Sequence, residues 1–206
     1  MADSIPIELS KQDHPENKLL FQTLKKYLPN DHLILYQQNL YGYQPDFIIF
    51  GPDLGLFVLE VEYLSNLSTW YFSKLAKYQI NSSAHFFQIP TLLRARNYVF
   101  QISKVLQQSL QAIFKNTCIT FPYGYGTIFP QLSKKNLQQK QLGSLLQYPN
   151  IMTREEIDPN SSAFSSKELT ERFKIMIKGS HSFTEPLFSD AIKSILLQDS
   201  LSTKAI

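Results

Sequence analysis

The sequence contains few of the residues that form disulfides or clustered metal sites. Its 206 residues include one cysteine, Cys118, so an internal disulfide and a multi-cysteine metal site are excluded. Cys118 follows a helical pattern and precedes an isoleucine, which favours a buried structural thiol over a nucleophile. The four histidines are scattered and show no ligand spacing: His14, His32, His85 and His181.

Long apolar runs and glycine-rich loops are also missing. No stretch reaches the roughly 18 apolar residues of a membrane-spanning helix, so no membrane partner is expected. The N-terminal segment MADSIPIELSKQD lacks a basic start followed by an apolar core, which predicts no secretion signal and a cytoplasmic location. None of the 7 glycines belongs to a G-x-x-x-x-G-K-S/T pattern, so this chain is not itself a helicase.

The composition is that of a globular protein with a sizeable core. Hydrophobic residues make up 43% of the chain and charged residues 18%, and the length predicts one domain or one domain with a small appendage. The 15 phenylalanines and 11 tyrosines favour a strand-rich core. A net charge of +3 permits a nucleic-acid partner without arguing for one. The lysine pairs of the sequence are isolated and do not form a basic stripe: Lys25-Lys26 and Lys134-Lys135, with Lys140 as one more scattered charge.

Two very apolar runs, 47–50 and 56–59, stand beside three carboxylates, Asp46, Glu60 and Glu62. Runs of this kind are typical of strands buried on both faces of a sheet, where a carboxylate is costly to desolvate. Side chains alternate along a strand, so Glu60 and Glu62 share one face and repel each other. The pattern therefore predicts a metal ion, an arginine or lysine, or a bound proton between them.

The order of elements predicts an α/β fold. Pro15 begins a helix that ends near Leu28, and three strands follow as an antiparallel meander around 32–36, 46–50 and 56–61. A long helix from Pro90 to about Phe114 then leads to a strand over 121–130, which is the usual form of a parallel crossover. Capping boxes at 153–156 and 165–168, begun by Thr153 and Ser165, and a helix start at Pro186 predict helices in the tail. We expect an extended leader (1–14), an α/β domain (15–150) and a helical C-terminal extension (151–206).

Four segments carry a resemblance to a known family: ENKLLFQTLKKYLPND, QPDFIIFGPDLGLFVLEVEYL, PTLLRARNYVFQISKVL and FPYGYGTIFPQL. In this order they cover much of residues 16–132. The chain resembles the PD-(D/E)XK nucleases and is most similar to the nuclease-related (NERD) domain that precedes superfamily-1 helicase modules. The resemblance implies a restriction-endonuclease-like core, built as helix, three-strand meander, helix and strand, with a helical tail.

The resemblance also implies a site and a chemistry. Glu16 is the helical acid, which positions water or binds a second ion, Asp46 is the principal metal ligand, and Glu60 is the second acid. The backbone carbonyl of Val61 is a further ligand. Hard carboxylate oxygens suit Mg²⁺ or Mn²⁺, so the implied activity is metal-dependent phosphodiester hydrolysis. The implied partners are nucleic acid, DNA in preference to RNA, and a helicase.

One position departs from the family pattern. Glu62 stands where the family has a lysine, and a glutamate repels the substrate phosphate. Arg94 or Arg96, near the start of the long helix, is a candidate replacement for that positive charge, although arginine is no proton shuttle. The competing interpretation makes either arginine an ion-pair partner of Glu62, and Glu62 itself is alternatively an exposed strand-end residue.

Three functional hypotheses therefore stand. In the first, the chain is a metal-dependent nuclease with Glu16, Asp46, Glu60, Glu62 and Arg94 at its site. In the second, it is a catalytically inactive nuclease-fold module that binds nucleic acid or docks a protein, because of Glu62. In the third, it is a structural partner of a helicase, and residues 151–206 carry the contact.

Overall fold

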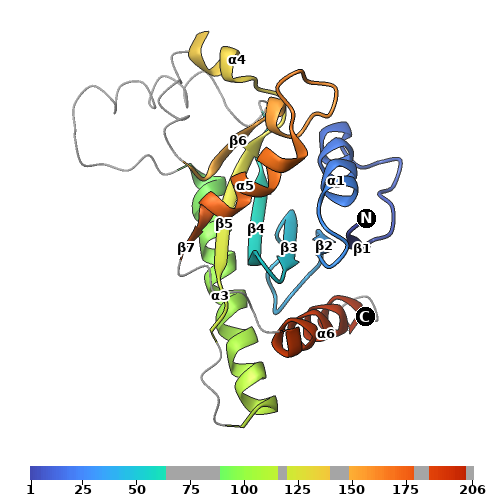
Figure 1. Ribbon diagram of the computed structural model, residues 1–206, viewed down its shortest axis with the longest axis vertical. Coiled ribbons are helices and arrows are strands. Elements are labelled where there is room, and N and C mark those ends of the chain that lie inside the picture. Colours follow the sequence, from blue (N-terminus) through green and yellow to red (C-terminus); the bar gives the residue numbers. More distant parts are fainter. Residues whose placement is uncertain (64–88, 116–119, 140–148, 179–185, 203–206) are drawn as a thin grey trace, which may run out of the picture.

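The computed structural model describes residues 1–63, 89–115, 120–139, 149–178 and 186–202. These residues form an α/β fold in which a mixed sheet lies between helices on both faces (Figure 1). The strands are β1 (Asp3–Ile5), β2 (Leu33–Tyr36), β3 (Phe47–Gly51), β4 (Gly55–Val61), β5 (Tyr123–Phe129), β6 (Ile151–Thr153) and β7 (Ile177–Lys178). The helices are α1 (Pro15–Tyr27), α3 (Pro90–Ile113), α4 (Lys134–Gln139), the 3-10 helix η3 (Arg154–Glu156), α5 (Ser166–Met176) and α6 (Pro186–Ser202).

The seven strands follow the order β1-β2-β3-β4-β5-β6, and β7 pairs with β5 beside this path. The predicted antiparallel meander is confirmed, because β2 pairs with β3 and β3 with β4 in antiparallel register. The predicted crossover is also confirmed, because β5 follows α3 and lies parallel to β4. In this register Glu60 stands opposite Thr127. The general α/β prediction therefore holds.

Two predicted segments differ from the structure. Residues 1–14 are not only an extended leader, since β1 pairs in parallel with β2 at the edge of the sheet. The segment 151–206 is not only helical, since β6 pairs in parallel and β7 antiparallel with β5. The predicted helices at Ser165 and Pro186 do form, as α5 and α6. The capping box at Thr153 starts only the short helix η3, whose C-cap is Ile157, close to Pro159, because the residue before a proline disfavours the helical conformation.

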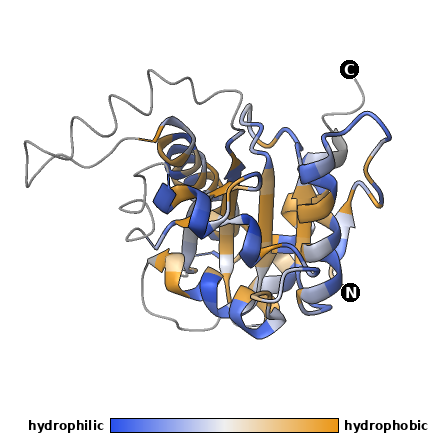
Figure 2. Cartoon of the chain, turned by 90° about the horizontal axis from the view of Figure 1, so that it is seen from above, coloured by the Kyte–Doolittle hydropathy of each residue, from blue (hydrophilic) through white to orange (hydrophobic). Residues whose placement is uncertain are grey.

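Alternation along the strands divides the core between the two faces. Phe57, Leu59 and Val61 of β4 pack with α1 and α5, whereas Leu56 and Val58 pack with α3 and α6. Figure 2 shows the hydrophobic colour concentrated on the strands between the helices, with hydrophilic residues on the outer surfaces. Both faces of β4 are thus covered, and a polar side chain on this strand needs a partner within the protein.

The helices begin as expected, with proline in the first turn of both α1 and α3. The helical spacing of apolar residues in the long helix predicts a buried stripe that includes Leu93 and Ile113. That prediction is wrong at these two positions, which are exposed, whereas the polar Thr91 and Ser103 are buried. Among the described residues, no helix has both the length and the apolar character needed to cross a membrane. The predicted roles of Cys118, His85, His181 and Lys140 fall outside the described residues.

Candidate functional site

Asp46 and Glu60 meet where β3 and β4 stop pairing. Phe47 and Leu59 are the last paired residues at this end of the hairpin. Beyond them, side-chain carboxylates accept the backbone hydrogen bonds in place of the neighbouring strand. The Asp46 N–H donates to Glu60 Oε1 over 2.9 Å, and the Val61 N–H donates to Asp46 Oδ2 over 2.9 Å. Glu60 is 1% exposed and Asp46 is half-buried. The structure thus brings together the two acids that the sequence placed at this site.

Arg94 comes to Glu60 from the second turn of α3, and its Nε donates to Glu60 Oε2. The prediction that an arginine pairs with Glu62 is therefore wrong in its partner. Arg96 points elsewhere, with its guanidinium 5.6 Å from the centre of the Phe100 ring. Burial opposes the charge on Arg94, but the Glu60 carboxylate outweighs it and raises the pKa of Arg94 further. Arg94 is therefore a permanent cation at the site.

Burial raises the pKa of Glu60 to about 7, and the charge of Asp46 adds to this effect. The hydrogen bonds from the Asp46 N–H and from Arg94 lower the pKa but only partly offset that rise. The negative charge of Asp46 thus disfavours ionisation of the buried Glu60 carboxyl. An added cation would relieve that repulsion.

Glu62 is buried, at 6% exposure, so the alternative of an exposed strand-end residue is excluded. Its Oε2 accepts a hydrogen bond of 2.8 Å from Thr91 Oγ1. The Thr127 hydroxyl lies 3.1 Å from both Thr91 Oγ1 and the Glu60 carbonyl oxygen. Thr91 and Arg94 are three residues apart on one face of α3, so Glu60 and Glu62 do share a face, as the strand alternation predicts.

Glu16 lies in the first turn of α1, between two side chains that the sequence did not indicate. Gln131 Nε2 donates to Glu16 Oε1 over 3.1 Å, and His14 Nδ1 contacts Glu16 Oε2. Burial raises the pKa of Glu16, but the hydrogen bonds and the His14 charge outweigh it and lower the pKa overall. His14 shows no ligand spacing in the sequence, and Gln131 simply follows β5. No sequence pattern reveals either residue.

Tyr63 connects the Glu16 neighbourhood to the carboxylate pair. Its ring centre lies 4.4 Å from that of His14, and its hydroxyl donates to Asn17 Oδ1 over 2.5 Å. Burial raises the pKa of Tyr63, and the charges of Asp46 and Glu16 contribute to the rise. Tyr63 therefore lies within electrostatic range of both acids. From Asn17 the network continues through Tyr36, whose pKa burial raises to about 12.

Carboxylate oxygens are suitable ligands for a hard divalent cation. In this structure, however, the oxygens of Asp46 and Glu60 accept hydrogen bonds from other groups of the protein. Among the described residues, no three His, Cys, Asp or Glu side chains are grouped as a metal site. Glu60 accepts from the Asp46 N–H and from Arg94, and within the described part of the chain Asp46 Oδ1 accepts only a long hydrogen bond of 3.5 Å, from Gln37. It is the Val61 N–H, not its carbonyl, that contacts Asp46. Both carboxylate oxygens of Glu60 thus already accept a hydrogen bond within the protein.

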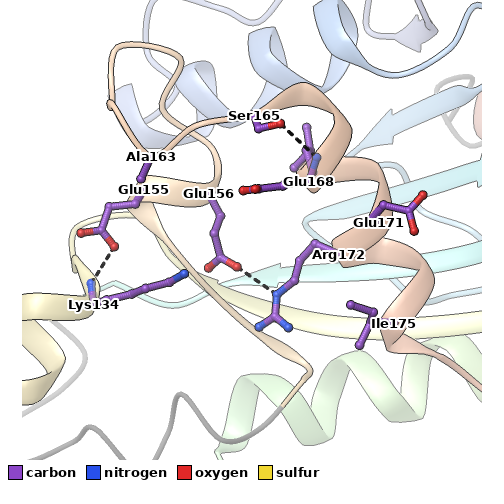
Figure 3. A pocket seen from close by; sticks show the side chains of 10 residues that line it. Lys134, Glu155, Glu156, Ala163, Ser165, Glu168, Glu171, Arg172 and Ile175 are labelled. Atoms are coloured by element: carbon purple, nitrogen blue, oxygen red, sulfur yellow. Dashed lines mark hydrogen bonds and ion pairs between the residues drawn. The ribbon is translucent and has the colours of Figure 1, made fainter.

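A cavity of about 230 Å³ lies elsewhere, between α5 and the η3 corner (Figure 3). Two of its carboxylates have partners in the lining: Arg172 Nε donates to Glu156 over 2.9 Å, and the backbone N–H of Lys134 donates to Glu155 over 2.9 Å. None of the predicted site residues lines it. This cavity therefore lies among α4, η3 and α5 and is separate from the carboxylate site.

No protein-family model, curated protein or solved structure matches the chain. The function is therefore inferred from the residues and their geometry.

Proposed function

We propose that this chain is a nuclease-related domain with a restriction-endonuclease-like core, and that it hydrolyses phosphodiester bonds of nucleic acid with a divalent metal ion. The observation that carries the proposal is the meeting of Asp46 and Glu60 at the ends of paired strands. A supporting observation is that the charges of both Asp46 and Glu16 act on the buried Tyr63 hydroxyl. The element order and the family resemblance of the sequence agree with it.

Each residue has a defined part in this proposal. Asp46 and Glu60 hold Mg²⁺ or Mn²⁺, which polarises the phosphate and activates water when bound. Arg94 supplies the positive charge that Glu62 does not, and at 46% side-chain exposure it lies within reach of a ligand in solvent. Glu16, kept anionic by Gln131 and His14, orients water.

Asp46→Ala tests the proposal directly. We expect the parent protein to bind Mn²⁺ in calorimetry and to cleave DNA in its presence. Removal of the Asp46 carboxylate should abolish both, lowering the cleavage rate by at least about 10³-fold, because the principal ligand is lost. The matched control is Asp190→Ala, an exposed aspartate on α6, which should retain both properties.

The parent protein failing to bind Mn²⁺ and to cleave any DNA or RNA would contradict the proposal. Equal cleavage by the parent and by Asp46→Ala would contradict it as well, because the activity would then have another source.

A second candidate is a catalytically inactive module that binds nucleic acid or docks a protein. Two observations favour it: Glu62 is buried against Thr91 at the position of the family lysine, and Arg94 already neutralises Glu60. On this hypothesis the carboxylates are retained as a bridge between β3 and β4. Metal would then have no effect on the affinity for nucleic acid.

Glu62→Lys distinguishes the two candidates. If the module is inactive because a lysine is missing, the parent binds a labelled oligonucleotide without cutting it, and Glu62→Lys gains Mn²⁺-dependent cleavage. Glu62→Gln is the control, because it removes the negative charge without supplying a positive one. Cleavage by the parent at a rate similar to that of Glu62→Lys would reject the inactive candidate.

The helicase-partner hypothesis remains a proposal, and its test has to respect the sheet. Deleting residues 151–206 would remove β6 and β7 as well as α5 and α6, which cover opposite faces of the core. If the truncated protein no longer bound a helicase, the cause would be unfolding of the domain and not the loss of a contact surface. A charged substitution at Leu187, which is 62% exposed on α6, leaves the core intact and tests the same contact.

A further inference from the structure

A cavity of about 560 Å³ lies between α1 and the N-terminal segment of the chain. Figure 1 shows that segment passing beside α1 at the edge of the molecule. The apolar part of the lining includes Ile7, Leu9 and Phe21, and Ile7 is 76% exposed. Three lysines belong to the lining, Lys18, Lys25 and Lys26. Met1 lines the cavity as well, and its terminal ammonium group donates to Asn30. The cavity thus combines an apolar wall with several ammonium groups.

The charge of these lysines is not balanced inside the cavity. Within the described ranges of the chain, none of the three forms an ion pair with a carboxylate, and the lining contains a single acid, Glu8. Lys18 Nζ donates to the Lys11 carbonyl over 2.8 Å, and Lys25 Nζ donates to the Ile7 carbonyl over 2.5 Å. An ammonium group has three donors, so each retains donors for a ligand. The cavity therefore has a net positive charge.

The spacing of the lysines matches a linear polyanion. Lys18 and Lys25 are seven residues apart, which places them on one face of α1 about 10 Å apart along its axis. Two ammonium groups spaced in this way can contact different phosphates of one nucleic-acid strand. Lys18 and Glu16 are two residues apart and point to different sides of α1, so the lysine face is separate from the face that carries Glu16.

We propose that the cavity along α1 is a binding site for the phosphate backbone of nucleic acid, with the lysines meeting phosphates and the apolar wall meeting sugars or bases. The inference rests on the proposed function and gives it a substrate-holding surface separate from the carboxylate site. Contacts of this kind position a strand without reading its sequence. The site should therefore bind different sequences with similar affinity.

The test measures binding without chemistry. A fluorescently labelled DNA oligonucleotide is titrated in EDTA, at salt concentrations between about 50 and 200 mM, with the parent and with the triple variant Lys18→Gln, Lys25→Gln, Lys26→Gln. We expect the variant to bind on the order of tenfold to a hundredfold more weakly at low salt. The slope of log affinity against log salt should fall by about 3, because each lost phosphate contact contributes close to one unit.

Two controls separate charge at this site from other effects. The triple variant Lys134→Gln, Lys135→Gln, Lys167→Gln removes the same charge from exposed positions outside the cavity and should bind like the parent. Arginine at positions 18, 25 and 26 preserves the charge and should retain the affinity and the salt slope. An equal loss in both glutamine variants would overturn the proposal, because net charge would then explain it.

The remaining outcomes distinguish this inference from the proposed function. Binding that depends on the lysines in a protein that never cleaves supports the site and rejects the nuclease. If the parent cleaves nucleic acid but the lysine variant binds it as well as the parent does, the nuclease is supported and the lysine site is rejected. A parent that binds vesicles of anionic lipid through these lysines, but not the oligonucleotide, overturns the assignment to nucleic acid.

Discussion

Glu60→Gln is expected to stabilise the metal-free protein at pH 8.5 by on the order of 3 kcal/mol. Burial and the Asp46 charge raise the pKa of Glu60 from its ordinary value of 4.5 to about 7 in the folded protein. At pH 8.5 the folded state therefore contains a buried carboxylate that is less stable there than in the unfolded chain. Glutamine keeps the shape, and its carbonyl oxygen can accept the Asp46 N–H hydrogen bond without the charge. Its amide NH2 then takes the place of the oxygen that Arg94 contacts, so Arg94 has to turn its exposed guanidinium to solvent.

The effect depends on pH in a defined direction. Between pH 4.5 and about 7 the folded protein holds the Glu60 proton more tightly than the unfolded chain, so the parent loses stability as the pH rises through this window. Below pH 4.5 both states are protonated and the penalty disappears. The advantage of Glu60→Gln should therefore be largest above pH 7 and close to zero at pH 4.

Thermal unfolding at the two pH values measures this prediction. At pH 8.5 the melting temperature of Glu60→Gln should exceed that of the parent by several degrees, since about 1 kcal/mol corresponds to 2–4 °C in a chain of this size. Glu171→Gln, at an exposed position of α5, is the control and should change little at either pH. A lower melting temperature for Glu60→Gln at pH 8.5 would show that Arg94 stabilises the charged form more than burial disfavours it.

The same substitution should weaken Mn²⁺ binding, because an amide oxygen lacks the charge of a carboxylate. A protein that is more stable and also unable to bind metal is the expected signature of a functional site maintained at a cost in stability. If the carboxylates only bridge β3 and β4, the parent protein does not bind Mn²⁺. Glu60→Gln is then more stable than the parent, and neither protein binds the metal.

Gly55→Ala is expected to destabilise the fold by more than about 4 kcal/mol, which is large for a single substitution. Gly55 begins β4 at φ +66°, a conformation that costs an L-residue about 1–2 kcal/mol. A Cβ there would lie 1.9 Å from the carbonyl oxygen of Pro122, which also accepts the Leu56 N–H hydrogen bond. The clash therefore forces apart β4 and β5, whose register places Glu60 beside Thr127.

Gly42→Ala is the matched control for Gly55→Ala. Gly42 also has a positive φ, +83°, but a Cβ at this position would have no atom within 4 Å. The variant should lose only the conformational cost of about 1–2 kcal/mol. Denaturant unfolding of both variants measures the difference, and equal losses at the two positions would show that the Pro122 contact is relieved without cost.

Much of the fold follows from local patterns. Proline starts, apolar runs and the long interval between the strands predict α1, the meander, α3 and the parallel strand β5. The missed strands β1, β6 and β7 are two or three residues long, too short to show alternation. Their existence depends on an open strand edge nearby, a property of the assembled sheet that no local pattern contains.

The candidate site is likewise only partly predictable from the sequence. The carboxylates are visible in the sequence because they interrupt apolar strands, but the partner of Arg94 is not. Whether Arg94 meets Glu60 or Glu62 depends on the rotation and height of α3 over β4, and the structure places Thr91 at Glu62 and Arg94 at Glu60.

The lysines of α1 form no continuous stripe in the sequence, yet three of them line one cavity. The Lys18–Lys25 spacing of seven residues indicates a common helix face, but the sequence shows no second wall for a cavity. That wall is the N-terminal segment, which returns along α1 because β1 pairs with β2. A binding surface that requires chain reversal is therefore missed by any pattern confined to one helix.

The pairing of β4 with β5 has a consequence for synthesis of the chain. The hairpin of β3 and β4 is complete at Val61, but β5 begins only at Tyr123, 62 residues later. At about 5–20 residues per second the ribosome needs roughly 3–12 s to supply it. During that time the nascent chain presents an apolar, unpaired strand edge, the kind of edge that promotes aggregation. Rapid translation through this interval, or a chaperone that covers the hairpin, would favour the yield of folded protein.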